Sequence, residues 1–156
     1  MYYSHFGWSA RSNSRGCMNK VLAFACLWLL TGCAIKQNVS PYTSTISGEL
    51  CIIEDPAVRS GFLTEYRRTL NEMGIMHRVI PADSSIEECS TTSTYTARWS
   101  WDFTLYMSHA LIKVYEAGQL TAEAEYDSRK GGLRLDKWKD AEPKIRELVH
   151  QLFPNY

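Results

Sequence analysis

The sequence predicts an α+β fold, a two-layer sandwich in which a small, mostly antiparallel sheet carries two helices on one face. Residues 95–103, "YTARWSWDF", place an apolar side chain at every second position, which is typical of a strand with one buried face. Residues 55–73 and 136–153 instead repeat apolar side chains every three or four positions, as amphipathic helices do. The expected order is strand, helix, four strands, helix.

The first predicted strand is residues 49–55, whose Leu-Cys-Ile-Ile centre is typical of a buried strand. Asp55 as N-cap and Pro56 at the first helical position predict the start of the first helix. Gly74 predicts its end. One apolar stripe runs along this helix, formed by Val58, Phe62, Leu63, Tyr66, Leu70 and Met73. Residues 76–82 predict a second short strand, and 83–93 a turn-rich loop.

The aromatic-rich strand at 95–103 is followed by a predicted hairpin at 105–128. The apolar side chains of the strand at 95–103 include Trp99 and Trp101, which we expect in the core. The hairpin turn is expected around 116–119, where Gly118 supplies a positive φ. Between Met107 and Ala110 the apolar positions change from odd to even numbers, which predicts a turn or a bulge there.

The last predicted element is the helix at 136–153, whose apolar face holds Trp138, Ile145, Leu148, Val149, Leu152 and Phe153. Pro143 lies too far along this segment for an uninterrupted helix that starts at Asp136. Either Asp140 is the effective N-cap, or the helix is kinked. Residues 49–156 are expected to form the globular domain.

The N-terminal segment has the order of a secretory signal peptide. Lys20 precedes an apolar run at 21–30, and the small residues Thr31 and Gly32 follow. The run is about half of the ~20 residues that a transmembrane helix needs. "LTGC" at 30–33 resembles the bacterial lipobox. The resemblance implies cleavage before Cys33 and a diacylglyceryl group on its sulfur. The alternatives are a secretory signal with a chance cysteine, or a short membrane anchor.

Residues 1–32 are therefore expected to be removed as a signal peptide. A signal that starts at Met18 would be complete, so residues 1–17 are either an upstream extension from a misassigned start or a long basic leader. Residues 33–48 are rich in Ser and Thr, and we expect them to form a lipidated tether between the membrane and the domain. We expect the acyl chains to be the contact with the membrane.

The charge and the cysteine content restrict the kinds of partner and of compartment that the sequence favours. The chain has 17 basic and 17 acidic residues, and three basic residues but no acidic ones precede Cys33. The part after Cys33 is therefore mildly acidic, which argues against a nucleic-acid partner. Cys51 and Cys89 remain there, and two cysteines in an exported protein favour one disulfide. Two separate buried thiols are the alternative.

The sequence offers little support for catalysis. His77, His109 and His150 lie in different predicted elements without metal-ligand spacing, so we expect no metal and no cofactor. Asp102 near His109 is a weak candidate dyad, and no G-x-S-x-G motif accompanies it. The basic loop at 129–134 could hold an anion through Arg129, Lys130 and its glycine amides, but a solvated loop is the favoured interpretation.

Aromatic residues supply the best functional candidate. If both helices cover one sheet face, Tyr106, Tyr115 and Tyr126 could line the other face as an exposed apolar patch. Together with Arg129 and Lys130 they form the candidate interaction surface. We expect a non-enzymatic module that binds a protein partner through this surface. The alternative is a binder of a small ligand or glycan.

The chain after the signal also resembles a family of small Gram-negative lipoproteins of uncharacterised function. The resemblance rests on "GCAIKQ" at 32–37, "CIIEDPAVRSGF" at 51–62, "TSTYTARWSWDFTLYM" at 92–107, "EYDSRKGG" at 125–132 and "KIRELVHQLF" at 144–153. It implies an envelope location and a compact α+β domain, and it implies no activity. Ala34 follows the anchor cysteine, and by resemblance to enterobacterial sorting it favours the periplasmic face of the outer membrane.

Overall fold

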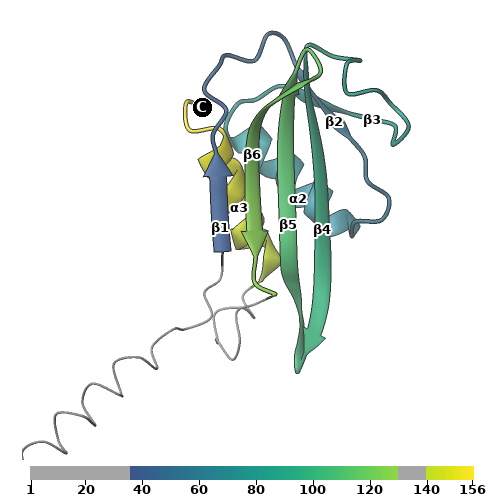
Figure 1. Cartoon of the computed structure of the whole chain (residues 1–156), viewed down its shortest axis with the longest axis vertical. Coiled ribbons are helices and arrows are strands. Elements are labelled where there is room, and N and C mark those ends of the chain that lie inside the picture. Colours follow the sequence, from purple (N-terminus) through teal and green to yellow (C-terminus); the bar gives the residue numbers. More distant parts are fainter. Residues whose placement is uncertain (1–35, 130–139) are drawn as a thin grey trace, which may run out of the picture. The chain divides into compact units, whose positions relative to one another are not determined.

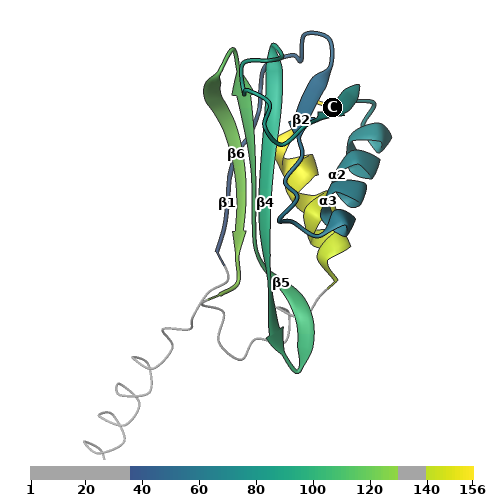
Figure 2. The same ribbon diagram turned by 90° about the vertical axis from the view of Figure 1, so that its right-hand side faces the viewer.

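The computed structural model describes residues 36–129 and 140–156. Within these residues, one six-stranded sheet carries two helices on the same face (Figures 1 and 2). The elements are β1 (Lys36–Ser40), β2 (Leu50–Ile53), α2 (Ser60–Glu72), β3 (His77–Ile80), β4 (Thr91–Asp102), β5 (Thr104–Glu116), β6 (Gln119–Asp127) and α3 (Ala141–Leu152). The strand order is β1-β6-β5-β4-β2-β3. Among the described strands only β2 pairs in parallel, with β3 and β4, so the predicted mostly antiparallel α+β fold is confirmed.

Helix α2 begins at Ser60, later than the predicted start at Pro56. Asp55 instead closes a turn: its Oδ1 accepts a hydrogen bond from the Ala57 amide at 2.9 Å, and its carbonyl accepts one from Val58 at 3.1 Å. This turn redirects the chain from β2 before the helix starts. At the other end, Gly74 has a φ of 73°, and the amide of Ile75 bonds the carbonyl of Leu70 at 2.9 Å. The predicted glycine stop is therefore confirmed, with Schellman geometry.

Strand β1 corrects the expectation of a tether over residues 33–48. It pairs antiparallel with β6, from Lys36 opposite Asp127 to Ser40 opposite Glu123. Tyr42 is buried directly after it, and its amide bonds the carbonyl of Leu152 at 2.7 Å. Without β1, the backbone groups of β6 would form an open sheet edge, so pairing is favoured although the segment is polar. This part of the segment therefore belongs to the domain.

The long hairpins follow the predicted pattern closely. The β5–β6 turn has positive φ at Ala117 and Gly118, at 47° and 78°. In the β4–β5 pair, Arg98 lies opposite His109 and Trp99 opposite Met107, so Ser108 is the extra residue of a bulge. The predicted change of phase between Met107 and Ala110 is confirmed. β4 starts earlier than expected, because residues 91–93 pair with β2.

The end of the β4–β5 hairpin departs from the prediction for Trp101. Trp99 is half-buried against the core, but Trp101 and Phe103 are exposed. The hairpin extends past the start of β1 and the end of β6 (Figure 1). Alternation along a strand shows which side chains share a face, but it does not show how far the covering helices reach. Trp101 therefore lies on the inner face of the sheet without lying in the core.

The start of helix α3 shows which of the two alternatives for Pro143 is correct, a later N-cap at Asp140 or a kinked helix. The helix begins at Ala141 with Asp140 at the N-cap position, so Pro143 falls in the first turn. There its missing N–H removes no helical hydrogen bond. The predicted part of the helix at 136–139 lies outside the described residues. The buried face includes the predicted Ile145, Leu148, Val149 and Leu152.

The predicted disulfide is present. Cys51 is fully buried in β2, and it is bonded to Cys89 in the loop between β3 and β4, with the two Cα atoms 6.2 Å apart. The bond fastens this loop to the centre of the parallel part of the sheet. Arg78 of β3 lies beside it, where its guanidinium donates to the Cys89 sulfur at 3.2 Å and pairs with Glu49 at 2.7 Å.

Candidate functional site

The sheet face turned away from the helices is the first candidate surface. Both helices cover the opposite face (Figure 2). On the uncovered face, β5 presents Tyr106, Leu111 and Tyr115, all half-buried. The register sets this face, since Tyr106 lies opposite Ser100 and Tyr115 opposite Thr92, whereas the neighbouring Met107 and Val114 are core residues. Tyr106 and Tyr115 are therefore brought to one face, about 30 Å apart along the strand.

Charged side chains occupy most of the space between these tyrosines. His109 Nε2 lies 3.1 Å from Glu125 Oε1, and Lys113 Nζ lies 3.7 Å from Glu123 Oε2. These pairs join β5 to β6 across the face. The surface is thus polar with a few aromatic and apolar side chains, rather than the continuous apolar patch that we expected.

Asp127 and Arg129 lie where β6 ends on this face. The Asp127 carboxylate accepts bonds from Arg129 Nε at 2.9 Å and from Arg129 Nη2 at 2.6 Å. These bonds hold the pKa of Asp127 well below its ordinary value, against a smaller opposing effect of burial. Arg129, which was considered above as an anion ligand beside the favoured interpretation of a solvated loop, therefore already has an anionic partner. Lys130 and Cys33 lie outside the described residues.

Tyr126 is misplaced in the predicted surface. It lies opposite Ala110 on the helix side of the sheet and is 4% exposed. Lys144 Nζ of α3 lies 5.2 Å from the centre of its ring, at cation–π distance. The sequence did indicate this placement. Tyr126 is an even number of positions from the small core residues Ala122 and Ala124, so it lies on the same face of the strand as they do. Acidic residues occupy the alternate positions of this strand.

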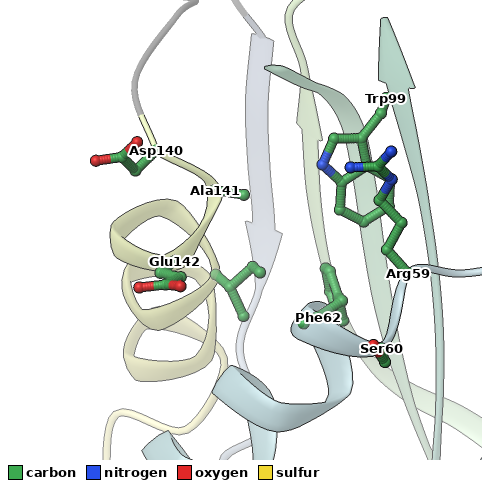
Figure 3. Close-up of a pocket in the computed structure, with 9 residues that line it drawn as sticks. Arg59, Ser60, Phe62, Trp99, Asp140, Ala141 and Glu142 are labelled. Carbon is green, nitrogen blue, oxygen red and sulfur yellow. The ribbon is translucent and has the colours of Figure 1, made fainter. Parts of the chain in front are cut away.

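A cleft between the two helix starts is the second candidate, and the sequence analysis did not predict it. Its volume is about 730 Å³, and its lining includes Arg59, Phe62, Trp99, Asp140 and Glu142. Arg59 extends from the start of α2 across the face of the Trp99 ring, with its Cζ 5.7 Å from the ring centre (Figure 3). This volume is in the range of small-molecule pockets, and Arg59 and Trp99 offer a cation and a ring face to a ligand.

The weak His109–Asp102 dyad is not formed in the structure. His109 lies opposite Arg98 in the sheet, whereas Asp102 lies opposite Thr104 at the hairpin end. The carboxylate beside His109 belongs to Glu125. Glu125 of the neighbouring strand β6, and not the nearby Asp102, is therefore the acidic partner of His109.

No group of three or more His, Cys, Asp or Glu side chains is placed to hold a metal ion in the part of the chain that the structure describes. Across the same residues, no helix combines the length and the apolar character that crossing a membrane requires. His77, His109 and His150 lie in β3, β5 and α3, respectively.

Comparison with known proteins gives a limited likeness. No family model matches the chain, and no curated protein matches it. Among solved structures, the PelC dodecamer from Paraburkholderia phytofirmans matches with a TM-score of 0.48 at 10% identity, over 76% of this chain and 95% of that one. A second crystal form, of a single-residue variant, matches with a TM-score of 0.47 at 10% identity, over 76% of this chain and 94% of that one.

Proposed function

We propose that this chain is a lipid-anchored protein of the bacterial envelope that binds a protein partner without catalysing a reaction. The anchor is an acylated Cys33, exposed when residues 1–32 are removed, and the location is the periplasmic face of the outer membrane. The lipobox-like "LTGC" at 30–33 supports the anchor. The Cys51–Cys89 disulfide supports an oxidising compartment, since such bonds are rare in the cytosol.

One observation carries the partner-binding role: the open face of β4, β5 and β6 combines tyrosines with charges of both signs. Tyr106 and Tyr115 are half-buried there, and the pairs His109–Glu125 and Lys113–Glu123 lie between them. Protein interfaces are enriched in tyrosine and carry a polar rim. A face that extends over three strands suits a protein surface better than a small molecule.

Crosslinking in intact envelopes, followed by capture of the acylated protein, tests this proposal. We expect one dominant protein partner, whose capture falls when Tyr106 and Tyr115 are both changed to Ser. Lys113→Ala should weaken capture as well. Arg67→Ala is the matched control, because Arg67 is an exposed basic residue on α2, on the helix side. Equal capture by all four proteins would contradict the proposed surface, and a product that retains residues 1–32 would contradict the anchor.

The cleft supports a second candidate function, the binding of a small ligand or glycan. Its specific support is the Arg59 guanidinium lying over Trp99 beside a volume of about 730 Å³. A ligand with a planar or sugar ring and a negatively charged group would fit these two side chains. Tryptophan fluorescence titrated with anionic saccharides tests it. A saturable change that is lost in Trp99→Phe supports this function, and a flat response contradicts it for these ligands.

A further inference from the structure

The tip of the β4–β5 hairpin is an exposed apolar projection. Trp101 is 75% exposed, Phe103 88% and Leu105 43%. Trp101 and Leu105 lie opposite each other on one face, and Phe103 forms the turn between the strands with a φ of 59°. Large apolar side chains grouped in this way on a projecting turn are typical of a contact surface.

The sheet register places this tip at the end where the chain enters β1. Lys36, Asp127, His109 and Arg98 form one row across β1, β6, β5 and β4. β4 runs from this row towards the tip, and β1 runs from it in the opposite direction (Figure 1). At about 3.3 Å per residue, Phe103 extends roughly 15 Å beyond the row.

The length of chain before β1 restricts the position of the anchor. Cys33 precedes Lys36 by three residues, so its Cα lies within about 11 Å of that of Lys36, even in a fully extended chain. An acylated Cys33 would therefore hold the tip end of the sheet, and not the Gly118 end, next to the bilayer.

We propose that Trp101, Phe103 and Leu105 form a second membrane contact, which enters the interface of the bilayer that holds the acyl chains. This inference rests on the proposed anchor at Cys33. Tryptophan and phenylalanine are well suited to the boundary between headgroups and acyl chains. Two contacts at one end fix the orientation of the domain, and the Gly118 turn then faces away from the membrane.

Lipid quenching of tryptophan fluorescence tests the contact. The acylated protein is reconstituted into phosphatidylcholine vesicles with or without brominated acyl chains, and flotation measures vesicle binding first. We expect brominated lipid to quench the emission of the wild type. Because Trp101 is one of three tryptophans after Cys33, Trp101→Phe should remove about half or more of that quenching.

Two further variants separate the tip from general effects on the protein. Phe103→Gly keeps the positive φ at the turn while it removes the apolar side chain, and it should reduce the quenching of Trp101. Leu120→Ser is the matched control, because Leu120 is 51% exposed beside the opposite turn. Brominated lipid should quench the tryptophan emission of Leu120→Ser as much as that of the wild type.

The outcomes distinguish this inference from the anchor on which it rests. Flotation with equal quenching in the wild type and Trp101→Phe would overturn the tip contact and keep the anchor. Protection of Trp101 from aqueous iodide without quenching by brominated lipid would also overturn it, because a second copy of the chain would then cover the tip. A wild type that fails to float would overturn the anchor, and this inference with it.

Discussion

Ser108 is the residue at which β5 leaves regular pairing, and its hydrogen bonds show how the bulge is accommodated. Its Oγ accepts a bond from Ser100 Oγ at 2.8 Å and donates one to the carbonyl of Arg98 at 3.2 Å. Its carbonyl accepts the amide of Ser128 at 2.9 Å. The hydroxyl and the carbonyl of Ser108 and the carbonyl of Arg98 thus have partners at the bulge, as buried polar groups require.

Replacement of Ser108 by Ala should therefore destabilise the protein although it removes one oxygen atom. We expect the free energy of unfolding to fall by about 1–2 kcal/mol, because both Ser100 and the carbonyl of Arg98 lose a partner. Denaturant unfolding measures this change. Ser100→Ala is the control and should cost less, because Ser108 keeps its bond to Arg98. An unchanged midpoint in Ser108→Ala would show that water satisfies these groups.

The second prediction at the residue scale concerns the titration of Asp127. Its bonds to Arg129 favour the charged carboxylate, so its folded pKa lies below the value of about 3.9 found in unfolded chains. The interaction thus stabilises the fold above about pH 4, and this contribution is lost as the pH falls towards the folded pKa. NMR of the carboxyl carbon should show a low midpoint that rises towards 3.9 in Arg129→Ala. A normal midpoint in the wild type would contradict the pairing.

At the scale of elements, one carboxylate joins the two helices. Glu65 of α2 is buried, and its Oε1 accepts a bond from Arg146 Nη2 of α3 at 2.7 Å. Arg68 is the other cation beside it, at 3.4 Å from Oε2, and is more exposed. A buried carboxylate that loses its main partner keeps the cost of its desolvation.

Arg146→Met should accordingly lower the free energy of unfolding by about 1–3 kcal/mol. Arg68→Met should change it by less than about 1 kcal/mol, because exposed pairs contribute little. Thermal or denaturant unfolding of both variants checks the difference. Equal losses would show that Arg146 does not hold Glu65 more strongly than Arg68 does.

The disulfide is the covalent connection between elements. Cys51 and Cys89 are separated by 38 positions, and a closed loop of this length restricts the unfolded chain by about 3–4 kcal/mol. We expect reduction with dithiothreitol to lower the denaturation midpoint strongly. The double variant Cys51→Ala and Cys89→Ala should be insensitive to the reductant. A wild type that is equally insensitive would mean that the bond does not stabilise the fold.

The elements differ in how far the sequence predicts them. The bulge, the Gly118 turn and the end of α2 depend on local pattern, and the sequence carries that pattern. β1 depends on the edge of β6, and a polar five-residue segment contains no sign of its distant partner. The exposure of Trp101 and the meeting of Arg59 with Trp99 likewise depend on where the helices start and end relative to the sheet. Packing, rather than periodicity, decides those positions.

For the whole molecule, the sheet has two distinct ends. The tip with Phe103 lies at the end where β1 begins, and the Ala117–Gly118 turn lies at the other end. Cys51 and Cys89 are bonded to each other, and an acylated Cys33 has no free thiol. In the proposed acylated chain that begins at Cys33, a cysteine introduced at either end would therefore be the one free thiol, and so a reporter of orientation.

We expect Phe103→Cys to react several-fold more slowly with a charged, membrane-impermeant maleimide in vesicles than in detergent. Leu120→Cys should react at similar rates in both, because the proposed orientation places its end of the sheet in water. The comparison of each variant with itself removes differences in intrinsic thiol reactivity. Slow reaction of Leu120→Cys in vesicles, together with fast reaction of Phe103→Cys, would show that the domain has the opposite orientation. Equal rates for both variants in vesicles and detergent would mean that the short connection to Cys33 does not hold the tip at the membrane.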